Sequence, residues 1–322
     1  MTSASSKERE AVWPDLPCAA WADTRQTLHL WTQIVGKIRV AQAPWLNHSW
    51  QTTLHLTPRG LSTGNIPCGR RLFDVAFDFI DHQLILRADD GADRHVALRP
   101  RTTADFFGAV RRALSELDLD VRIDRTPNEI ADAIPFDRDE VHAAYDPVHA
   151  ERFWRVLLQV DRVFSLFRTG FLGKSSPSHF FWGSFDLAVT RFSGRRAPLH
   201  PGGAPGLPDA VAREAYSHEV SSAGFWPGGA GVDHPAFYAY AYPQPAGYAE
   251  AKVAPAEARY DPALGEFILP YDAVRLAPDP DAALLAFLES AHAAAASLGG
   301  WDRASLECAL GRPRKPRPVS PP

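Results

Sequence analysis

The chain has 322 residues, of which 45% are hydrophobic and 22% are charged, and its formal net charge is −4. This apolar content and balanced charge exclude intrinsic disorder for the body of the chain. The lack of net positive charge argues against binding to nucleic acid or to an anionic membrane. The length fits about two domains, or one large domain.

The residue usage indicates a bacterial, cytoplasmic protein. Arginine greatly outnumbers lysine among the 34 basic residues, which is typical of a G+C-rich bacterial genome. The three cysteines, Cys18, Cys68 and Cys308, form no CxxC pair, which excludes a disulfide scaffold and a zinc knuckle. No run of 18 apolar residues and no signal peptide is present, so we expect no membrane association.

The first half of the chain predicts a helix, then strands, then a second helix. Residues 1–12 are polar and are expected to be disordered. Leu28, Trp31 and Ile34 recur with helical spacing within a predicted helix over 23–42. Further elements predicted from alternation and turn residues are strands over 49–57, 73–80, 83–88 and 95–99 and a helix over 101–117.

The second half repeats that order. A long apolar stripe predicts a helix over 147–172, and the longest alternating segment predicts one strand over 179–192. The remaining predictions are strands over 217–225, 236–242 and 265–269, a helix over 279–297 and a short helix from Trp301. The tail at 312–322 is rich in proline and basic residues, which predicts an extended chain.

The two halves also share a spacing of residues. Arg59 follows Trp50 by nine residues, Arg191 follows Trp182 by nine, and a Gln–Ile or Gln–Val pair precedes each on a helix. We therefore expect an α+β fold of antiparallel sheets with covering helices, built as pseudo-repeats over 13–135 and 136–311, the second with Pro/Gly-rich insertions. Each repeat would be a helix–four-strand–helix unit, and the alternative is a chance similarity. Two such units could join edge to edge or enclose a cavity.

The segment 179–192 is the best candidate for a pocket wall. On a single strand, Trp182, Ser184 and Asp186 share one face, which mixes a large ring, a hydroxyl and a carboxylate, while His179 lies on the opposite face. A carboxylate in mid-strand needs compensation, so we expect Asp186 to pair with Arg191 or Arg195. The best candidates for proton transfer are His179 and Asp186, although their odd separation opposes a dyad.

A second candidate wall lies at 225–248. Tyr238, Tyr240 and Tyr242 alternate with alanine, so they line one face of a strand, which either borders a pocket or packs under the Ala-rich helix at 279–297. Trp226 and the glycines after it could form a lid. The full set of predicted ligand-binding residues is Trp50, His48, Trp182, Ser184, Arg191, Arg195, Trp226 and Tyr240.

Several stretches resemble one known bacterial family. HFFWGSFDLAVTRFSGR, together with NHSWQTTLHLTPRGLSTG, GEFILPYDAVR and LGGWDR, is similar to the family of unknown function DUF5996 over roughly residues 13–310. The resemblance implies a stand-alone protein of about this length. It implies no activity and no catalytic residue.

Familiar cofactor motifs are missing. GxGxxG, GxxxxGK[ST] and HExxH do not occur, so nothing supports a nucleotide cofactor, and a metal is not expected despite the 12 histidines. The cofactor stays unknown. We expect a protein that binds a small organic molecule in an aromatic-walled pocket between the repeats, with His, Asp and Arg available for catalysis. The alternative is a protein–protein interaction module whose exposed rings are the contact surface. The sequence does not fix the oligomeric state.

Overall fold

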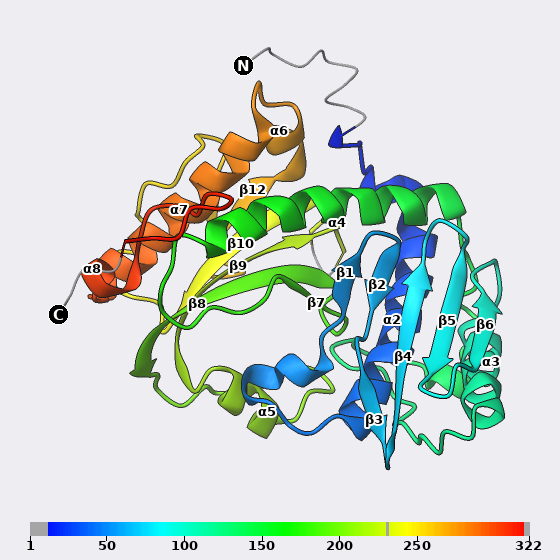
Figure 1. Cartoon of the computed structure of the whole chain (residues 1–322). Helices are drawn as coiled ribbons and strands as arrows, with labels where there is room; N and C mark the ends of the chain where they lie inside the picture. Colours follow the sequence, from blue (N-terminus) through cyan, green and yellow to red (C-terminus); the bar gives the residue numbers. More distant parts are fainter. Residues whose placement is uncertain (1–11, 230–231, 319–322) are drawn as a thin grey trace.

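The computed structural model describes residues 12–229 and 232–318. It confirms the predicted α+β class, with helices packed on two antiparallel sheets of six strands each. In Figure 1 the first sheet stands upright and the second lies beside it, with α4 running along one side of both.

The first half contains two long helices and the first sheet. The sheet has the strand order β1-β2-β4-β5-β6, and β3 pairs with β4. The elements are η1 (Cys18–Trp21), α2 (Ala22–Gln42), η2 (Asn47–Thr52), β1 (His55–Thr57), β2 (Gly60–Ser62), β3 (Ile66–Cys68), β4 (Arg71–Asp78), β5 (Gln83–Ala88), β6 (Asp93–Ala97) and α3 (Thr103–Glu116).

The predicted helix positions of this half are confirmed, and their cause is visible. Leu28, Trp31 and Ile34 are fully buried on one side of α2. The Thr102 hydroxyl accepts the Asp105 backbone N–H at 3.1 Å, which caps the N-terminus of α3 as expected of threonine. The helix α2 packs against β3, α3 against β6, and the two helices pack against each other, so their apolar residues join the core beside the first sheet.

The second half contains the second sheet, with the strand order β11-β12-β10-β9-β8-β7. The elements are η3 (Phe136–Arg138), α4 (Pro147–Arg168), β7 (His179–Phe181), β8 (Asp186–Arg196), α5 (Asp209–Ala215), β9 (His218–Trp226), β10 (Ala236–Tyr242), β11 (Arg259–Asp261), β12 (Glu266–Pro270), α6 (Tyr271–Arg275), α7 (Pro280–Leu298) and α8 (Arg303–Leu306).

The two sheets meet at their edges. Leu54, just before β1, and Phe180 on β7 exchange backbone hydrogen bonds of 2.9 and 2.7 Å. The helix α4 packs against β1 and β8, so it spans the junction (Figure 1). Of the two arrangements considered from the sequence, the edge-to-edge one is therefore present.

The second sheet presents different side chains on its two faces. Phe237, Ala239 and Ala241 of β10 belong to the main core, with which α7 also packs. Tyr238 and Tyr240 lie on the other face, in a small separate cluster. The tyrosines of this strand are thus turned away from the Ala-rich helix, and they face the cavity described below.

Two strand predictions are wrong in part. The segment 49–57 is extended only over β1, because His48 and Ser49 have left-handed backbone (φ 63° and 58°) and Trp50 lies on η2. The segment 179–192 is a hairpin, since a turn at 182–185, with Phe185 at φ 59°, separates β7 from β8.

The residues that suggested a duplication are not equivalent in the structure. Trp50 lies on a 3-10 helix and Trp182 in a hairpin turn. Gln33 is fully buried, whereas Gln159 is partly exposed and accepts a hydrogen bond from Arg162. Each half holds a six-stranded sheet instead of the expected four strands. The duplication and the boundary between 135 and 136 stay predictions.

The ends of the chain can be described in part. Residues 1–11, predicted to be disordered, and 319–322 of the tail lie outside the described residues. Residues 312–318 are exposed, and Arg317 donates a hydrogen bond to the Ala309 carbonyl at 3.1 Å. Within the described ranges, no helix has the length and the apolar content needed to cross a membrane.

Candidate functional site

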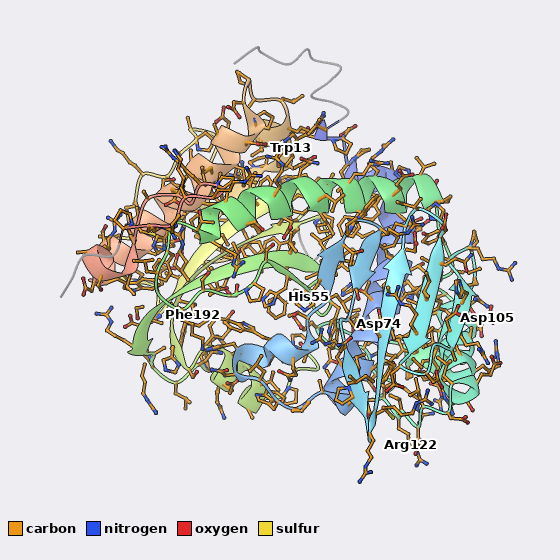
Figure 2. All side chains as sticks on the ribbon, in the orientation of Figure 1. Trp13, His55, Asp74, Asp105, Arg122 and Phe192 are labelled. Atoms are coloured by element: carbon orange, nitrogen blue, oxygen red, sulfur yellow. The ribbon has the colours of Figure 1, made fainter. Side chains whose placement is uncertain are left out.

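A cavity of about 670 Å³ lies against the tyrosine face of the second sheet. Its walls come from β8, β9 and β10, from η2, and from the segment 124–129, and residues 200–216, including α5, border it. In Figure 2, Phe192 of β8 marks one side of it. The side chains that line it and carry the arguments below are those of Lys37, His48, Ser49, Trp50, Asp124, Glu129, Trp182, Ser184, Asp186, Val211, Tyr216, Tyr238 and Tyr240.

Trp182 is held in place by α2. Its indole Nε1 donates a 2.7 Å hydrogen bond to the Thr52 carbonyl. A Cβ at Gly36 would overlap the indole ring, so glycine at this helix position lets the ring lie directly on the backbone of α2. The turn after β7 thereby presents a fixed ring to the cavity.

Asp186, the first residue of β8, is buried and is paired with hydroxyls. Its two carboxylate oxygens accept hydrogen bonds from Ser184 and from Tyr238. Tyr238 reaches it by crossing Gly224, where any Cβ would overlap the phenol ring. Burial raises the pKa of Asp186 to about 6, although the two hydroxyls favour its charged form. The predicted arginine partner is wrong, because Ser184 in the hairpin turn and Tyr238 on β10 bond the carboxylate instead.

Glu129 was missed by the sequence analysis. Its backbone is left-handed at φ 58°, a strained conformation for a side chain of this kind. The buried Gln33 amide fixes this segment, because it accepts the Asn128 N–H at 2.7 Å and donates to the Asn128 carbonyl at 2.9 Å. The carboxylate then passes over Gly183, where a Cβ would overlap Glu129 Oε1.

Glu129 lines the cavity and is exposed to solvent there. Partial desolvation of its carboxyl by the surrounding protein raises the pKa of Glu129 to about 7, and the nearby charge of Asp186 raises it further. No hydrogen bond from its carboxylate to another described residue is present.

A third carboxyl lies behind the tyrosines. Glu266 of β12 has a raised pKa of about 8, through burial and then through the charge of Asp186. Its Oε2 is buried and has no hydrogen-bond partner among the described residues. On the cavity side, the hydroxyls of Tyr240 and Tyr216 lie 2.8 Å apart. Three carboxyls with raised pKa values therefore cluster beside an aromatic wall.

The wall formed by η2 holds the predicted residues His48 and Trp50. His48 Nδ1 lies 2.8 Å from the Ala215 carbonyl and Nε2 lies 2.6 Å from Lys174 Nζ, which fits a neutral ring that donates to the carbonyl and accepts from the lysine. Burial lowers the pKa of His48, which favours this neutral form. The ammonium of Lys174 also lies 5.2 Å from the centre of the Trp50 ring.

Four of the predicted site residues do not line this cavity. Burial lowers the pKa of His179 to about 3, and its ring lies beside Thr53, away from the cavity lining. Arg191 is fully buried on the opposite face, where its guanidinium lies 3.4 Å from the centre of the Phe167 ring.

The other two are Arg195 and Trp226. Arg195 pairs with Glu219 at 2.7 Å outside the cavity. Trp226 packs on Tyr238, with ring centres 4.4 Å apart, and the glycines after it lie against Cys18 and Arg25. Trp226 therefore does not lie over this cavity as the expected lid, and residues 200–216 border it instead. Trp50, His48, Trp182, Ser184 and Tyr240 do line it.

A second hollow, of about 770 Å³ and more open, lies between α3 and the segment 118–125. This groove is the larger of the two hollows by volume, and the tyrosine-walled cavity is the less open one. Arg111, Arg122 and Arg125 border this groove, and no enclosed carboxyl cluster faces it. Among the described residues, no group of three His, Cys, Asp or Glu side chains is placed to hold a metal ion.

Fold and site together define an α+β protein with two edge-joined antiparallel sheets and a concave cavity lined by aromatic and acidic side chains. The model of the family of unknown function DUF5996 matches residues 13–308, so the chain belongs to that family. This confirms the resemblance seen in the sequence. No curated protein and no solved structure matches the chain.

Proposed function

We propose that this protein binds a small organic molecule in the cavity on the tyrosine face of the second sheet. The observation that supports this most is the composition of the walls: rings of Trp50, Trp182 and Tyr240 surround a few polar groups, among them Ser184 and Asp186. The volume of about 670 Å³ is in the range of ligand sites, which are mostly apolar with few placed polar groups.

The shape of the site favours this over an interaction module. An interaction module would present its rings on the outer surface, and the exposed apolar residues beside the cavity include Trp45 and Leu46, which are 55% and 49% exposed. A surface that binds a protein partner would therefore be centred on these two residues, of which Trp45 also borders the cavity. The other rings line a concave space bordered by residues 200–216, a shape that suits a small ligand better than a flat macromolecular contact.

Any proton transfer in this cavity would use Glu129 and Asp186 instead of His179. Two carboxyls with pKa values near neutrality, side by side in one cavity, are the groups that general acid–base chemistry requires. For the cellular setting we propose the bacterial cytoplasm, which is consistent with the free thiols of Cys18, Cys68 and Cys308.

The test is a ligand-observed NMR screen of aromatic fragments. Val211 on α5 lines the cavity, whereas its neighbour Ala210 is exposed and does not. We expect fragments to bind the parent and Ala210→Trp, and to lose their binding in Val211→Trp, where the indole fills the cavity. Hits that survive in Val211→Trp, or an absence of hits in the parent, would contradict the proposal.

A further inference from the structure

We propose that the ligand of this cavity is an organic cation: a protonated amine carried on an apolar or aromatic body, with the nitrogen held by Glu129 and Asp186. The inference rests on the proposed function and adds the chemical class of the ligand. It is drawn from the charges that line the cavity, from the rings around them, and from a buried hydroxyl that lacks a partner.

The charges are unbalanced. Of the charged side chains that line the cavity, Lys37 is attracted to Asp124, and each shifts the pKa of the other in favour of its charged form. Glu129 and Asp186 form no ion pair with any residue in 12–229 or 232–318, and Asp186 is bonded by two neutral hydroxyls. The cavity therefore has two carboxyls without a basic partner, and a ligand cation would supply one.

The rings add to this preference. Trp50, Trp182 and Tyr240 present aromatic surface to the same space, and a desolvated cation over such a ring is attracted by its quadrupole. A ligand anion would face both carboxylates, and a neutral ligand would leave them unpaired in the cavity. Of the three classes, the cation is the one that both the carboxyls and the rings attract.

A separate observation comes from η2. Ser49 lines the cavity and is 9% exposed, yet its Oγ has no hydrogen-bond partner among the described residues. Buried hydroxyls are normally satisfied, so this one is free to bond a polar group of a ligand. Its backbone is left-handed, like that of the neighbouring His48.

The experiment is isothermal titration of the full chain with three probes of one shape: benzylamine, benzyl alcohol and benzoate. We expect benzylamine to bind most tightly. Replacing a carboxylate that bonds the ammonium removes a charge-assisted hydrogen bond. Glu129→Gln should therefore weaken the binding of benzylamine by roughly tenfold to a hundredfold, and the binding of benzyl alcohol by about twofold at most. The control is Glu116→Gln, at the C-terminal end of α3 and outside the cavity, and it should leave the affinity for both probes unchanged.

Proton release gives a readout that a loss of folding cannot imitate. A bound ammonium favours ionised carboxyls, so benzylamine binding near pH 6 should release protons, seen as a heat that depends on the buffer, and Glu129→Gln should reduce the release. Asp186→Asn provides a second variant, and Glu129 is the first choice because no hydrogen bond within the described chain depends on its carboxylate.

Specific results would overturn the inference. Benzyl alcohol or benzoate binding as tightly as benzylamine would refute the cationic class while leaving the proposed function intact. Benzylamine binding that Glu129→Gln leaves unchanged would refute the assigned carboxyl. If benzylamine does not bind, the inference fails, and the fragment screen with Val211→Trp decides separately whether the cavity binds any small molecule.

Discussion

Replacing Gly224 with alanine should destabilise the protein through a contact between two strands. The added Cβ would overlap the ring of Tyr238, which is 5% exposed and cannot move aside freely. Overpacking of a core costs about 1–3 kcal/mol. The displaced phenol would also lose its hydrogen bond to Asp186, and a bond to a charged group contributes about 1.5–3 kcal/mol. We expect Gly224→Ala to lower the free energy of unfolding by about 2.5–6 kcal/mol.

The assay is urea unfolding followed by tryptophan fluorescence and circular dichroism. Tyr238→Phe should cost about 1.5–3 kcal/mol, since it removes the hydroxyl and keeps the ring. In a Tyr238→Ala background the ring that opposes the new methyl group is absent, so Gly224→Ala should then change stability by only about 0.5 kcal/mol. An equal cost of Gly224→Ala in both backgrounds would refute the reasoning.

Three further predictions concern the supports of the cavity. In thermal unfolding, Gly36→Ala should destabilise the protein by about 1–3 kcal/mol, because the new Cβ displaces the Trp182 ring. The control is Gly108→Ala on α3, whose Cβ would have one neighbour at 3.5 Å, and it should stabilise the protein by about 0.5–1 kcal/mol. Gln33→Ala should speed hydrogen exchange at the Asn128 amide and cost about 1–3 kcal/mol, and Gln159→Ala should do neither. Stability should fall as pH rises from about 6.5 to 8, because the pKa of Glu266, raised to about 8, lets the folded state bind a proton that the unfolded state has lost. In denaturation experiments at successive pH values, Glu266→Gln should make this fall smaller.

Below that window, buried histidines oppose the effect of the carboxyls. His179 and His292 have pKa values lowered by burial to about 3, so their stabilisation is lost as pH falls below about 6.5. Carboxyls with raised pKa values act in the opposite direction there, and their contribution grows as pH falls towards about 4. We therefore assign the decline above pH 6.5 to the carboxyls, and a stability that rises from pH 6.5 to 8 would contradict their raised pKa values.

Elements with strong periodicity could be predicted from the sequence. The apolar spacing in α2 and the Thr102 cap of α3 encode those helices locally, and the strand β10 was predicted with its observed bounds. The alternation that suggested a strand at Trp50 failed, because consecutive left-handed residues at His48 and Ser49 carry no periodic signal. Local patterns report secondary structure, and they do not report such exceptional backbone.

The candidate site depends on contacts between distant parts of the chain. Asp186 was recognised as a carboxylate that needs compensation, yet its partner Tyr238 is 52 residues away and comes from β10. Glu129 lies in a stretch without periodicity, and its position depends on Gln33, which lies on α2 near the other end of this half. The one sequence signal for these contacts lies in two glycines: Gly183 makes room for Glu129, and Gly224 makes room for Tyr238.

The most direct test of the central claim is to soak crystals of the protein with aromatic fragments and to locate the bound molecules. Two hollows compete, the tyrosine-walled cavity of about 670 Å³ and the groove of about 770 Å³ beside α3. We predict fragments in the first, with their rings against Trp50, Trp182 or Tyr240 and amine groups at Glu129 and Asp186. Fragments that gather in the groove beside α3 and leave the tyrosine-walled cavity empty would contradict the account.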